Sequence, residues 1–187
     1  MDTRIRISLD EFKTFTTTEH KYPLSDYFDK FVDHLANDIL NINTGAEFYK
    51  KLTRGQRILW SYSNLTGQIE NGGINQFYWN YGSDYFEDVK DVMSIIKDTK
   101  FTSLIFKYQE KFLKSKELLI NYKYLDKKEP ELKLGQYDPN AEYVNYYGLW
   151  SNTFGGNDLD SYYYSNSKTL DQFIIDYINN NPEEFIK

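Results

Sequence analysis

The sequence predicts a mainly α-helical protein, and three observations lead to this prediction. Apolar side chains recur at every third or fourth residue over most of the chain, which is the period of an amphipathic helix. Ser and Thr residues precede these stretches and glycines follow them, as helix caps do. Hydrophobic residues make up 40% of the 187 residues. This is enough for a buried core, so we expect a single domain over residues 1–187, a compact helical bundle of about six or seven helices.

The N-terminal stretch contains a short alternating segment and then the first helix. Ile5, Ile7 and Leu9 alternate with polar residues, which predicts a short N-terminal strand or an extended arm. Ser25 is expected to cap the first helix, with Asp26 in the first turn, where a carboxylate complements the helix dipole. The buried face of this helix is predicted from its spacing to contain Phe28, Phe31, Val32, Leu35 and Ile39.

The middle of the chain reads as a series of helices separated by glycines. Thr53 is expected to cap a helix that ends at Gly72–Gly73, because glycine readily takes the left-handed conformation that closes helices. A short aromatic helix is predicted over Ile74–Tyr81. Ser83 is then expected to cap a helix that runs from Asp84 to about Lys97.

The last third of the chain contains two further predicted helices and an irregular segment between them. Thr102 is expected to cap a helix that runs to about Tyr124. Residues 125–156 contain two prolines and several glycines and are predicted to be irregular, with Trp150 and the tyrosines packing part of the segment down. Thr169 is expected to cap the final helix.

Charge and composition narrow the classes of partner and compartment. There are 22 Lys and Arg against 28 Asp and Glu, which gives a net charge of −6. An acidic surface disfavours direct nucleic-acid binding, which needs basic side chains, and permits a basic protein partner. The chain has no cysteine, no signal-like apolar stretch at its N-terminus and no apolar run of membrane-spanning length. We therefore expect a cytoplasmic protein with no membrane contact.

Two segments resemble a known bacterial family. Glu70-Asn71-Gly72-Gly73 is followed by Asn75, Gln76, Phe77 and Asn80 and then by the stretch SDYFEDVKDVMSII. This succession resembles the signature of the DNA-mimic protein 19 family. The C-terminal stretch from Leu159-Asp160 to Glu184-Phe185 is similar to the ending of that family. The resemblance places a family-like core at residues 53–124 and 157–187. It implies a compact helical fold, and an acidic surface that imitates DNA and occupies a DNA-binding protein.

The first candidate site is the corner between two predicted helices, which we call the Glu70–Asn80 corner. Its glycines allow a tight reversal, and its polar side chains can bond the free backbone groups at the helix ends. We favour this structural role. A polar pocket for a small ligand, or an enzymatic site, is the alternative. The residues concerned are Glu70, Asn71, Gly72, Gly73, Asn75, Gln76 and Asn80.

The second candidate site consists of two acidic helix faces. One is predicted to contain Asp84, Glu87, Asp88 and Asp91, and the other Asp26, Asp29 and Asp33. Within each set the spacing places the carboxylates on one side of a helix, about 6 Å apart for an i to i+4 step, which is near the phosphate spacing of one DNA strand. Such faces suit a basic partner. The alternative is an ordinary solvated helix face, with acids near the N-terminus where the dipole favours them.

Catalytic motifs are missing from the sequence. The histidines are His20 and His34, and neither stands in a recognisable catalytic pattern. The segment Gly155–Asp160 offers oxygens for calcium but lacks the pattern of a calcium loop, so we interpret it as a turn. We expect no catalysis, no cofactor and no metal. The leading hypothesis is a non-enzymatic acidic protein-binding module, such as a DNA mimic that occupies a transcription regulator; an immunity or antitoxin protein that neutralises a toxin is the alternative.

Overall fold

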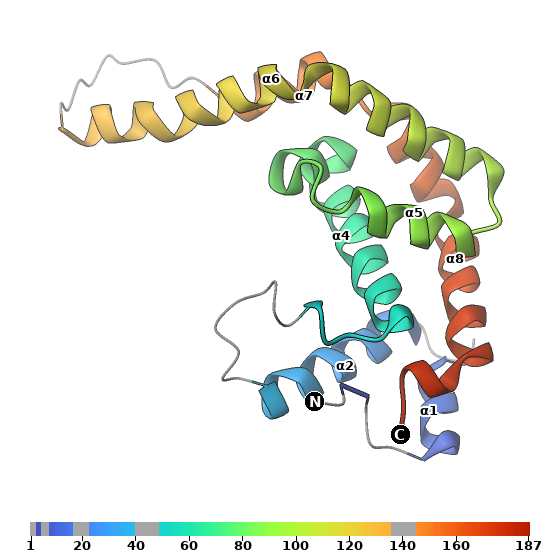
Figure 1. The fold of residues 1–187 in the computed structure, drawn as a ribbon. Coiled ribbons are helices and arrows are strands. Elements are labelled where there is room, and N and C mark those ends of the chain that lie inside the picture. Colours follow the sequence, from blue (N-terminus) through green and yellow to red (C-terminus); the bar gives the residue numbers. More distant parts are fainter. Residues whose placement is uncertain (1–2, 5–7, 17–22, 40–48, 136–144) are drawn as a thin grey trace. The chain divides into compact units, whose positions relative to one another are not determined.

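The computed structural model describes residues 3–4, 8–16, 23–39, 49–135 and 145–187 (Figure 1). In these ranges the elements are α1 Leu9–Thr16, α2 Pro23–Ile39, α4 Arg54–Tyr81, α5 Phe86–Ile95, α6 Thr99–Gly135, α7 Tyr146–Phe154, α8 Asn157–Asn180 and the 3-10 turn η1 Pro182–Glu184. The predicted mainly helical class is confirmed. Within the described ranges, no helix is both long enough and apolar enough to cross a membrane.

The chain forms two compact units. The first unit contains residues 1–64, 87–98 and 163–187, and the second contains residues 65–86 and 99–162. Two helices, α4 and α8, contribute one part to each unit. The single-domain boundary of 1–187 stays a prediction.

Aromatic rings form the centre of the first unit. Phe12 of α1 packs edge to face on Tyr27 of α2, with ring centroids 5.4 Å apart. Tyr27 packs in the same way on Phe185, which follows η1, at 5.7 Å. All three side chains are buried. Because these rings come from α1, α2 and the C-terminal segment, they tie together parts of the chain that are far apart in sequence.

The predicted N-terminal strand is wrong at Leu9, the last of its three apolar residues, because Leu9 belongs to helix α1. Leu9 is the first residue of α1, whereas Ile5 and Ile7 lie outside the described residues. The hydroxyl of Ser8 accepts the backbone N–H of Glu11 at 3.1 Å. Ser8 and Glu11 have the spacing of a capping box, which is a local signal for a helix start that the sequence analysis overlooked.

Helix α2 begins at Pro23, two residues before the predicted cap Ser25. Proline is favoured in the first turn because its missing N–H would have no partner there. The predicted apolar face is confirmed for Phe31, which is buried, and Phe28 packs on Trp60 of α4 with ring centroids 5.8 Å apart.

Helix α4 begins with a capping box, as the position of Thr53 predicts. The Thr53 hydroxyl accepts the N–H of Gln56 at 3.2 Å, and Gln56 Oε1 accepts the N–H of Thr53 at 3.1 Å. Gln56 is fully buried and also donates to the carbonyl of Thr3 at 2.9 Å. The reciprocal bonds satisfy two backbone donors that a helix start leaves free.

The second unit is built on α6 and α7, which run alongside each other (Figure 1). Tyr78 of α4 stacks on Phe112 of α6 with ring centroids 4.9 Å apart, and packs on Phe154 of α7 at 5.3 Å. Trp150 of α7 stacks on Phe154 at 4.7 Å and is fully buried. The prediction that Trp150 packs against the rest of the protein is therefore confirmed.

The predicted start and end of α6 are wrong. Much of the segment predicted to be irregular is also helical. Helix α6 begins at Thr99 and continues past Tyr124 to Gly135, through residues whose Lys, Glu and Leu content favours a helix despite Pro130. Helix α7 occupies residues 146–154, where Asn145 caps the helix by accepting the N–H of Gly148. Residues 136–144 lie outside the described residues.

Helix α8 begins at Asn157, twelve residues before the predicted cap Thr169. The extra turns are rich in Ser, Asn and Tyr, which are weak helix formers. Burial of Leu159 and Tyr163 stabilises these turns, and burial of this kind is a tertiary effect that local propensity does not show.

Candidate functional site

The Glu70–Asn80 corner is a break within α4. Gly72 has φ −165° and ψ 21°, and Gly73 has φ 79° and ψ 178°. Residues that have a side chain rarely adopt the backbone angles of Gly73, so glycine is required there. The break confirms the predicted stop at Gly72–Gly73 and the short helix that follows. It also leaves the N–H of Ile74 at the start of a new helical segment, where no carbonyl of α4 can accept it.

Asp160 of α8 accepts this free donor. Its Oδ1 lies 2.8 Å from the N of Ile74. The carboxyl is half-buried, and this burial raises the pKa of Asp160 above its ordinary value, with a further rise from Asp158 and an opposing effect of the bond from Ile74. A Cβ on Gly73 would collide with Asp160 Oδ2, and a Cβ on Gly156 would lie 2.6 Å from Cγ2 of Ile74. The two glycines thus allow the carboxyl to approach the helix start.

Three amide side chains of the corner donate hydrogen bonds to residues outside it. Gln68 Oε1 accepts from Gln76 Nε2 at 3.0 Å and from Asn80 Nδ2 at 2.6 Å. Asn75, which is buried, donates through Nδ2 to Ser151 Oγ at 2.8 Å. Oδ1 of Asn75 is buried and has no hydrogen-bond partner within the described part of the chain. From the bonds that are made, we interpret the corner as a fixed reversal between two helical segments.

Glu70 and Asn71 lie on the last turn before the break, and both are exposed. Tyr147 of α7 closes the same turn by donating its hydroxyl to the carbonyl of Gly72 at 3.1 Å. The ring of Tyr147 packs edge to face on Trp79 with centroids 5.4 Å apart. The corner therefore has one buried side, at Asn75 and Asp160, and one exposed side.

The role of Asp160 gives a testable pH dependence. Asp160→Ala removes the cap and is expected to lower the free energy of unfolding by about 1–2 kcal/mol. Asp160→Asn keeps an oxygen acceptor and removes the ionisation. Because the folded-state pKa is raised above the ordinary 3.8, the folded state holds the proton more tightly, and stability falls as pH rises from that value through the folded pKa.

Urea unfolding of both variants and the parent chain across this pH range checks the prediction. The parent chain should lose stability relative to Asp160→Asn as pH rises, whereas Asp160→Ala should be less stable than Asp160→Asn at every pH. An Asn variant as unstable as the Ala variant would show that Oδ1 does not act as a cap.

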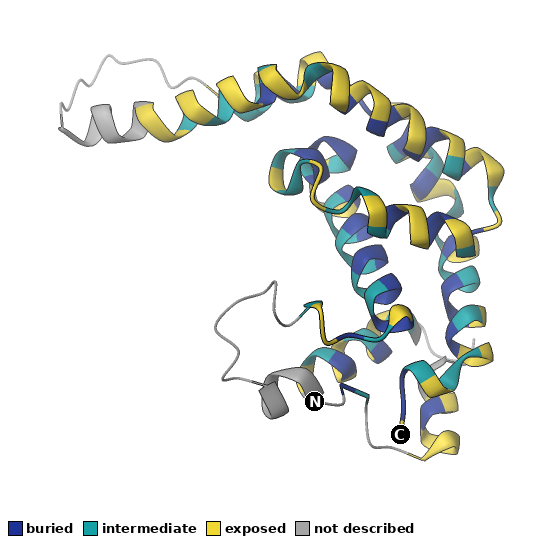
Figure 2. Cartoon of the chain, viewed as in Figure 1, coloured by how far each residue is buried: buried dark blue, intermediate teal, exposed yellow. Residues whose placement is uncertain are grey.

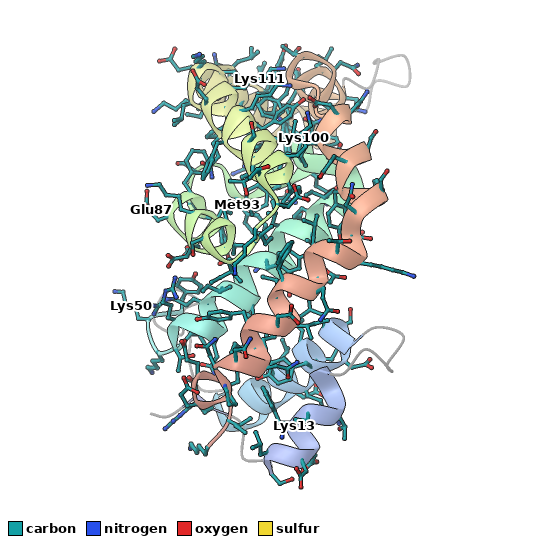
Figure 3. The ribbon with its side chains drawn as sticks, turned by 90° about the vertical axis from the view of Figure 1, so that its right-hand side faces the viewer. Lys13, Lys50, Glu87, Met93, Lys100 and Lys111 are labelled. Atoms are coloured by element: carbon teal, nitrogen blue, oxygen red, sulfur yellow. The ribbon has the colours of Figure 1, made fainter. Side chains whose placement is uncertain are left out.

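The predicted acidic face on α5 is only partly present. Helix α5 begins at Phe86, so Asp84 lies in the preceding turn and does not share the helical face; this part of the prediction is wrong. Gly82, with φ 61°, and the following turn delay the start of the helix. Glu87 and Asp91 are exposed and Asp88 is half-buried. Figure 3 shows Glu87 on the outer side of α5.

Both exposed acids of α5 have a cation beside them. Lys90 lies 3.0 Å from Glu87, and Arg54 of α4 lies 3.5 Å from Asp91. All four side chains are well exposed, so these pairs contribute little stability. They do reduce the negative potential that α5 presents to a partner.

The acidic face on α2 has the predicted form. Asp26, Asp29 and Asp33 are all exposed, and they follow the i, i+3, i+7 spacing along α2. Tyr27 and Phe31, which are fully buried, occupy the other side of the helix. The three carboxylates therefore form a row about 10 Å long on the outer side of the first unit.

A family model described as DMP19-like protein matches residues 50–181, which is more than two thirds of the 187 residues. The chain belongs to the DMP19-like protein family. The matched range includes residues 125–156 and the segments whose motifs resemble the family, except for the last residues of the C-terminal one, Glu184 and Phe185 among them. Comparisons with curated proteins and with solved structures gave no match.

In this DMP19-like chain, the acids of the C-terminal motif cap helix starts. Asp160 caps the second segment of α4, as described above. In the first unit, Glu184 Oε2 accepts the N–H of Gly55 at the start of α4, and Oε1 accepts the hydroxyl of Tyr177 at 3.1 Å. The carbonyl of Glu184 accepts the Thr53 hydroxyl at 2.7 Å. Both acids stand in the C-terminal motif, but their neighbours in sequence do not indicate these roles.

The other candidate site residues in the DMP19-like chain are already bonded to neighbouring side chains or lie outside the described residues. The predicted turn at Gly155–Asp160 is the start of α8, where Asp158 accepts from Lys107 at 2.6 Å and from the hydroxyl of Tyr108. Desolvation opposes ionisation of Asp158, but these bonds outweigh it and lower its pKa. Across the described ranges, no three His, Asp or Glu side chains are grouped to hold a metal ion. His20 and the side chain of His34 lie outside the described residues.

Proposed function

We propose that this DMP19-like chain is a non-enzymatic protein-binding module that presents exposed carboxylates to the basic surface of a DNA-binding protein. The observation that carries the proposal is the row of Asp26, Asp29 and Asp33 on α2, opposite buried aromatic side chains. Membership of the DMP19-like family supports it. We expect the chain to act in the cytoplasm, where a bacterial DNA-binding regulator works.

The spacing of the row suits a site built for phosphates. Asp29 and Asp33 are separated by one i to i+4 step, a rise of about 6 Å, which is close to the distance between successive phosphates of one strand. A lysine or arginine pair that bridges two phosphates can therefore bridge these two carboxylates. The contact would be electrostatic, so it would speed association and weaken as salt rises.

The two acidic faces are not expected to contribute equally. On α5, Lys90 and Arg54 partly neutralise Glu87 and Asp91. Within the described part of the chain, the ion pairs do not include Asp29 or Asp33. The α2 row should therefore provide most of the attraction to a basic partner, and α5 should add a smaller part.

The test begins with the full chain immobilised and incubated with host lysate at low and high salt, with mass spectrometry of the recovered proteins. A DNA-binding protein recovered at low salt and released at high salt is the expected result. The purified partner is then titrated with labelled DNA in the presence of the chain. Displacement of the DNA by the chain supports the proposal, because a DNA mimic occupies the surface that binds DNA.

Charge reversal identifies the face that binds. Asp29→Lys with Asp33→Lys is expected to lower affinity for that partner by about tenfold or more, and Glu87→Lys with Asp91→Lys by less. Asp176→Lys with Glu183→Lys is the matched control, because both residues are exposed in the first unit and the net charge changes equally. Unchanged affinity in the α2 variant, or a partner that stays bound at high salt, such as a toxin, would overturn the proposal.

A further inference from the structure

Helix α6 exposes a regular row of large apolar side chains. Phe106, Leu113 and Ile120 are 40%, 51% and 61% exposed, and they recur at every seventh residue. Tyr124, one turn further on, is 59% exposed. We call these four residues the α6 row. Figure 2 shows a continuous exposed side along this helix.

The α6 row is separate from the face that packs in the second unit. The buried side chains of α6 are Phe101, Leu104, Ile105, Tyr108, Phe112 and Leu119. At 3.6 residues per turn, the centre of this buried set lies about 130° around the helix from the α6 row. Apolar side chains that line up on the outer side of a helix, away from the core, mark an interaction site.

Lysines border the α6 row on one side. Helical spacing places Lys116 and Lys127 along this edge, and both are exposed. On the other edge Lys107 and Lys114 lie farther from the row and are paired with Asp158 and Glu110. The whole helix carries nine lysines against five acidic residues, so it is net positive in a chain of net charge −6. An occupant of this face must therefore be apolar at its centre and acidic along the edge that faces Lys116 and Lys127.

Two glutamates within the α6 row favour a protein helix over a lipid surface as its binding partner. Glu110 and Glu117 stand between Phe106, Leu113 and Ile120 along the same side, and both are exposed. A bilayer would have to accept these carboxylates at the boundary with its acyl chains, which is unfavourable. A partner helix can place a polar or basic side chain opposite each of them, and a repeat of seven residues suits packing between helices.

We propose that the α6 row binds an amphipathic helix of another protein whose apolar row is bordered by Asp and Glu. The partner helix lies along α6, its apolar side chains contact Phe106, Leu113 and Ile120, and its acids face Lys116 and Lys127. This surface belongs to the second unit, whereas the acidic rows of the proposed function belong to the first. Either proposal can therefore fail without the other.

The probe is a fluorescent synthetic peptide of about four heptads, with leucine at the two core positions of each heptad and glutamate at the flanking positions. A second peptide has lysine at every flanking position. Fluorescence anisotropy with the full-length chain should show binding of the glutamate peptide and at least about tenfold weaker binding of the lysine peptide. Raising the salt concentration should narrow this difference, because the flanking pairs are exposed.

Three variants locate the site. Leu113→Lys with Ile120→Lys should lower affinity for the glutamate peptide by about tenfold or more, and Lys116→Glu with Lys127→Glu should lower it mainly at low salt. Leu149→Lys is the matched control, since Leu149 is 45% exposed on α7 in the same unit and lies outside the α6 row. All of these positions are exposed, so circular dichroism should show unchanged helix content.

Four results would overturn the proposal. The first is equal binding of the two peptides, and the second is an equal loss of affinity in the Leu149 control. The third is light scattering that shows self-association of the chain and its loss in Leu113→Lys with Ile120→Lys, because a second copy would then cover the row. The fourth is binding to phosphatidylserine vesicles, but not to the peptide, that depends on the row.

Discussion

Trp150→Ala is expected to lower the free energy of unfolding by about 3–5 kcal/mol, the range for removing a large buried aromatic side chain. Trp150 is fully buried and stacks on Phe154, which in turn packs on Tyr78. The substitution leaves a cavity beside these rings. For a chain of this length, each kcal/mol lowers the melting temperature by about 2–4 °C.

Neighbouring and conservative variants separate packing from other effects. Leu149→Ala, at an exposed position next to Trp150, should change stability by less than about 0.5 kcal/mol. The indole nitrogen of Trp150 has no hydrogen-bond partner within the described part of the chain. Trp150→Phe therefore loses no hydrogen bond and should cost clearly less than Trp150→Ala. Thermal unfolding followed by circular dichroism measures all three, and a small effect of Trp150→Ala would contradict the packing described for the second unit.

Gly73→Ala is expected to lower the free energy of unfolding by about 3 kcal/mol, from backbone strain and the lost cap together. The backbone of Gly73 has φ 79°, and a Cβ there would collide with the Asp160 carboxylate. The new methyl group thus strains the turn and pushes away the acceptor that holds the N–H of Ile74.

Gly67→Ala is the matched control on the same helix. An added Cβ at Gly67 meets nothing within 4 Å, and alanine is favoured over glycine in a helix interior, so this variant should gain about 0.5–1 kcal/mol. Urea unfolding compares the two. If Gly73→Ala were as stable as the parent chain, the break in α4 would not need a glycine.

Local signals explain the parts of the fold that the sequence predicted well. The stop at Gly72–Gly73 follows from the conformational freedom of glycine, and the start at Thr53 follows from a cap within one turn. The α2 acids were placed correctly because helical spacing alone puts them opposite the buried rings. The same spacing failed for Asp84, because the turn after Gly82 delays the start of α5.

The parts that were missed depend on contacts between distant segments. Nothing near Asp160 in sequence indicates that its carboxylate caps Ile74, and nothing near Asn157 indicates that the weak helix formers after it fold as α8. Helix α1 is different, because the Ser8 and Glu11 pair was present and was overlooked. Helix α6 is longer than predicted because the helix-favouring residues around Pro130 outweigh the effect of the proline.

The two caps on α4 also have a consequence for the order in which the chain folds. Asp160 and Ile74 are 86 residues apart in sequence, and Glu184 and Gly55 are 129 apart. During synthesis, both segments of α4 leave the ribosome long before either acid is made. Helix α4 can form early, but the N–H groups at the starts of its two segments have no acceptor until α8 and η1 have folded against them. Hydrogen exchange during refolding should therefore protect the amides of Gly55 and Ile74 later than those in the middle of each segment.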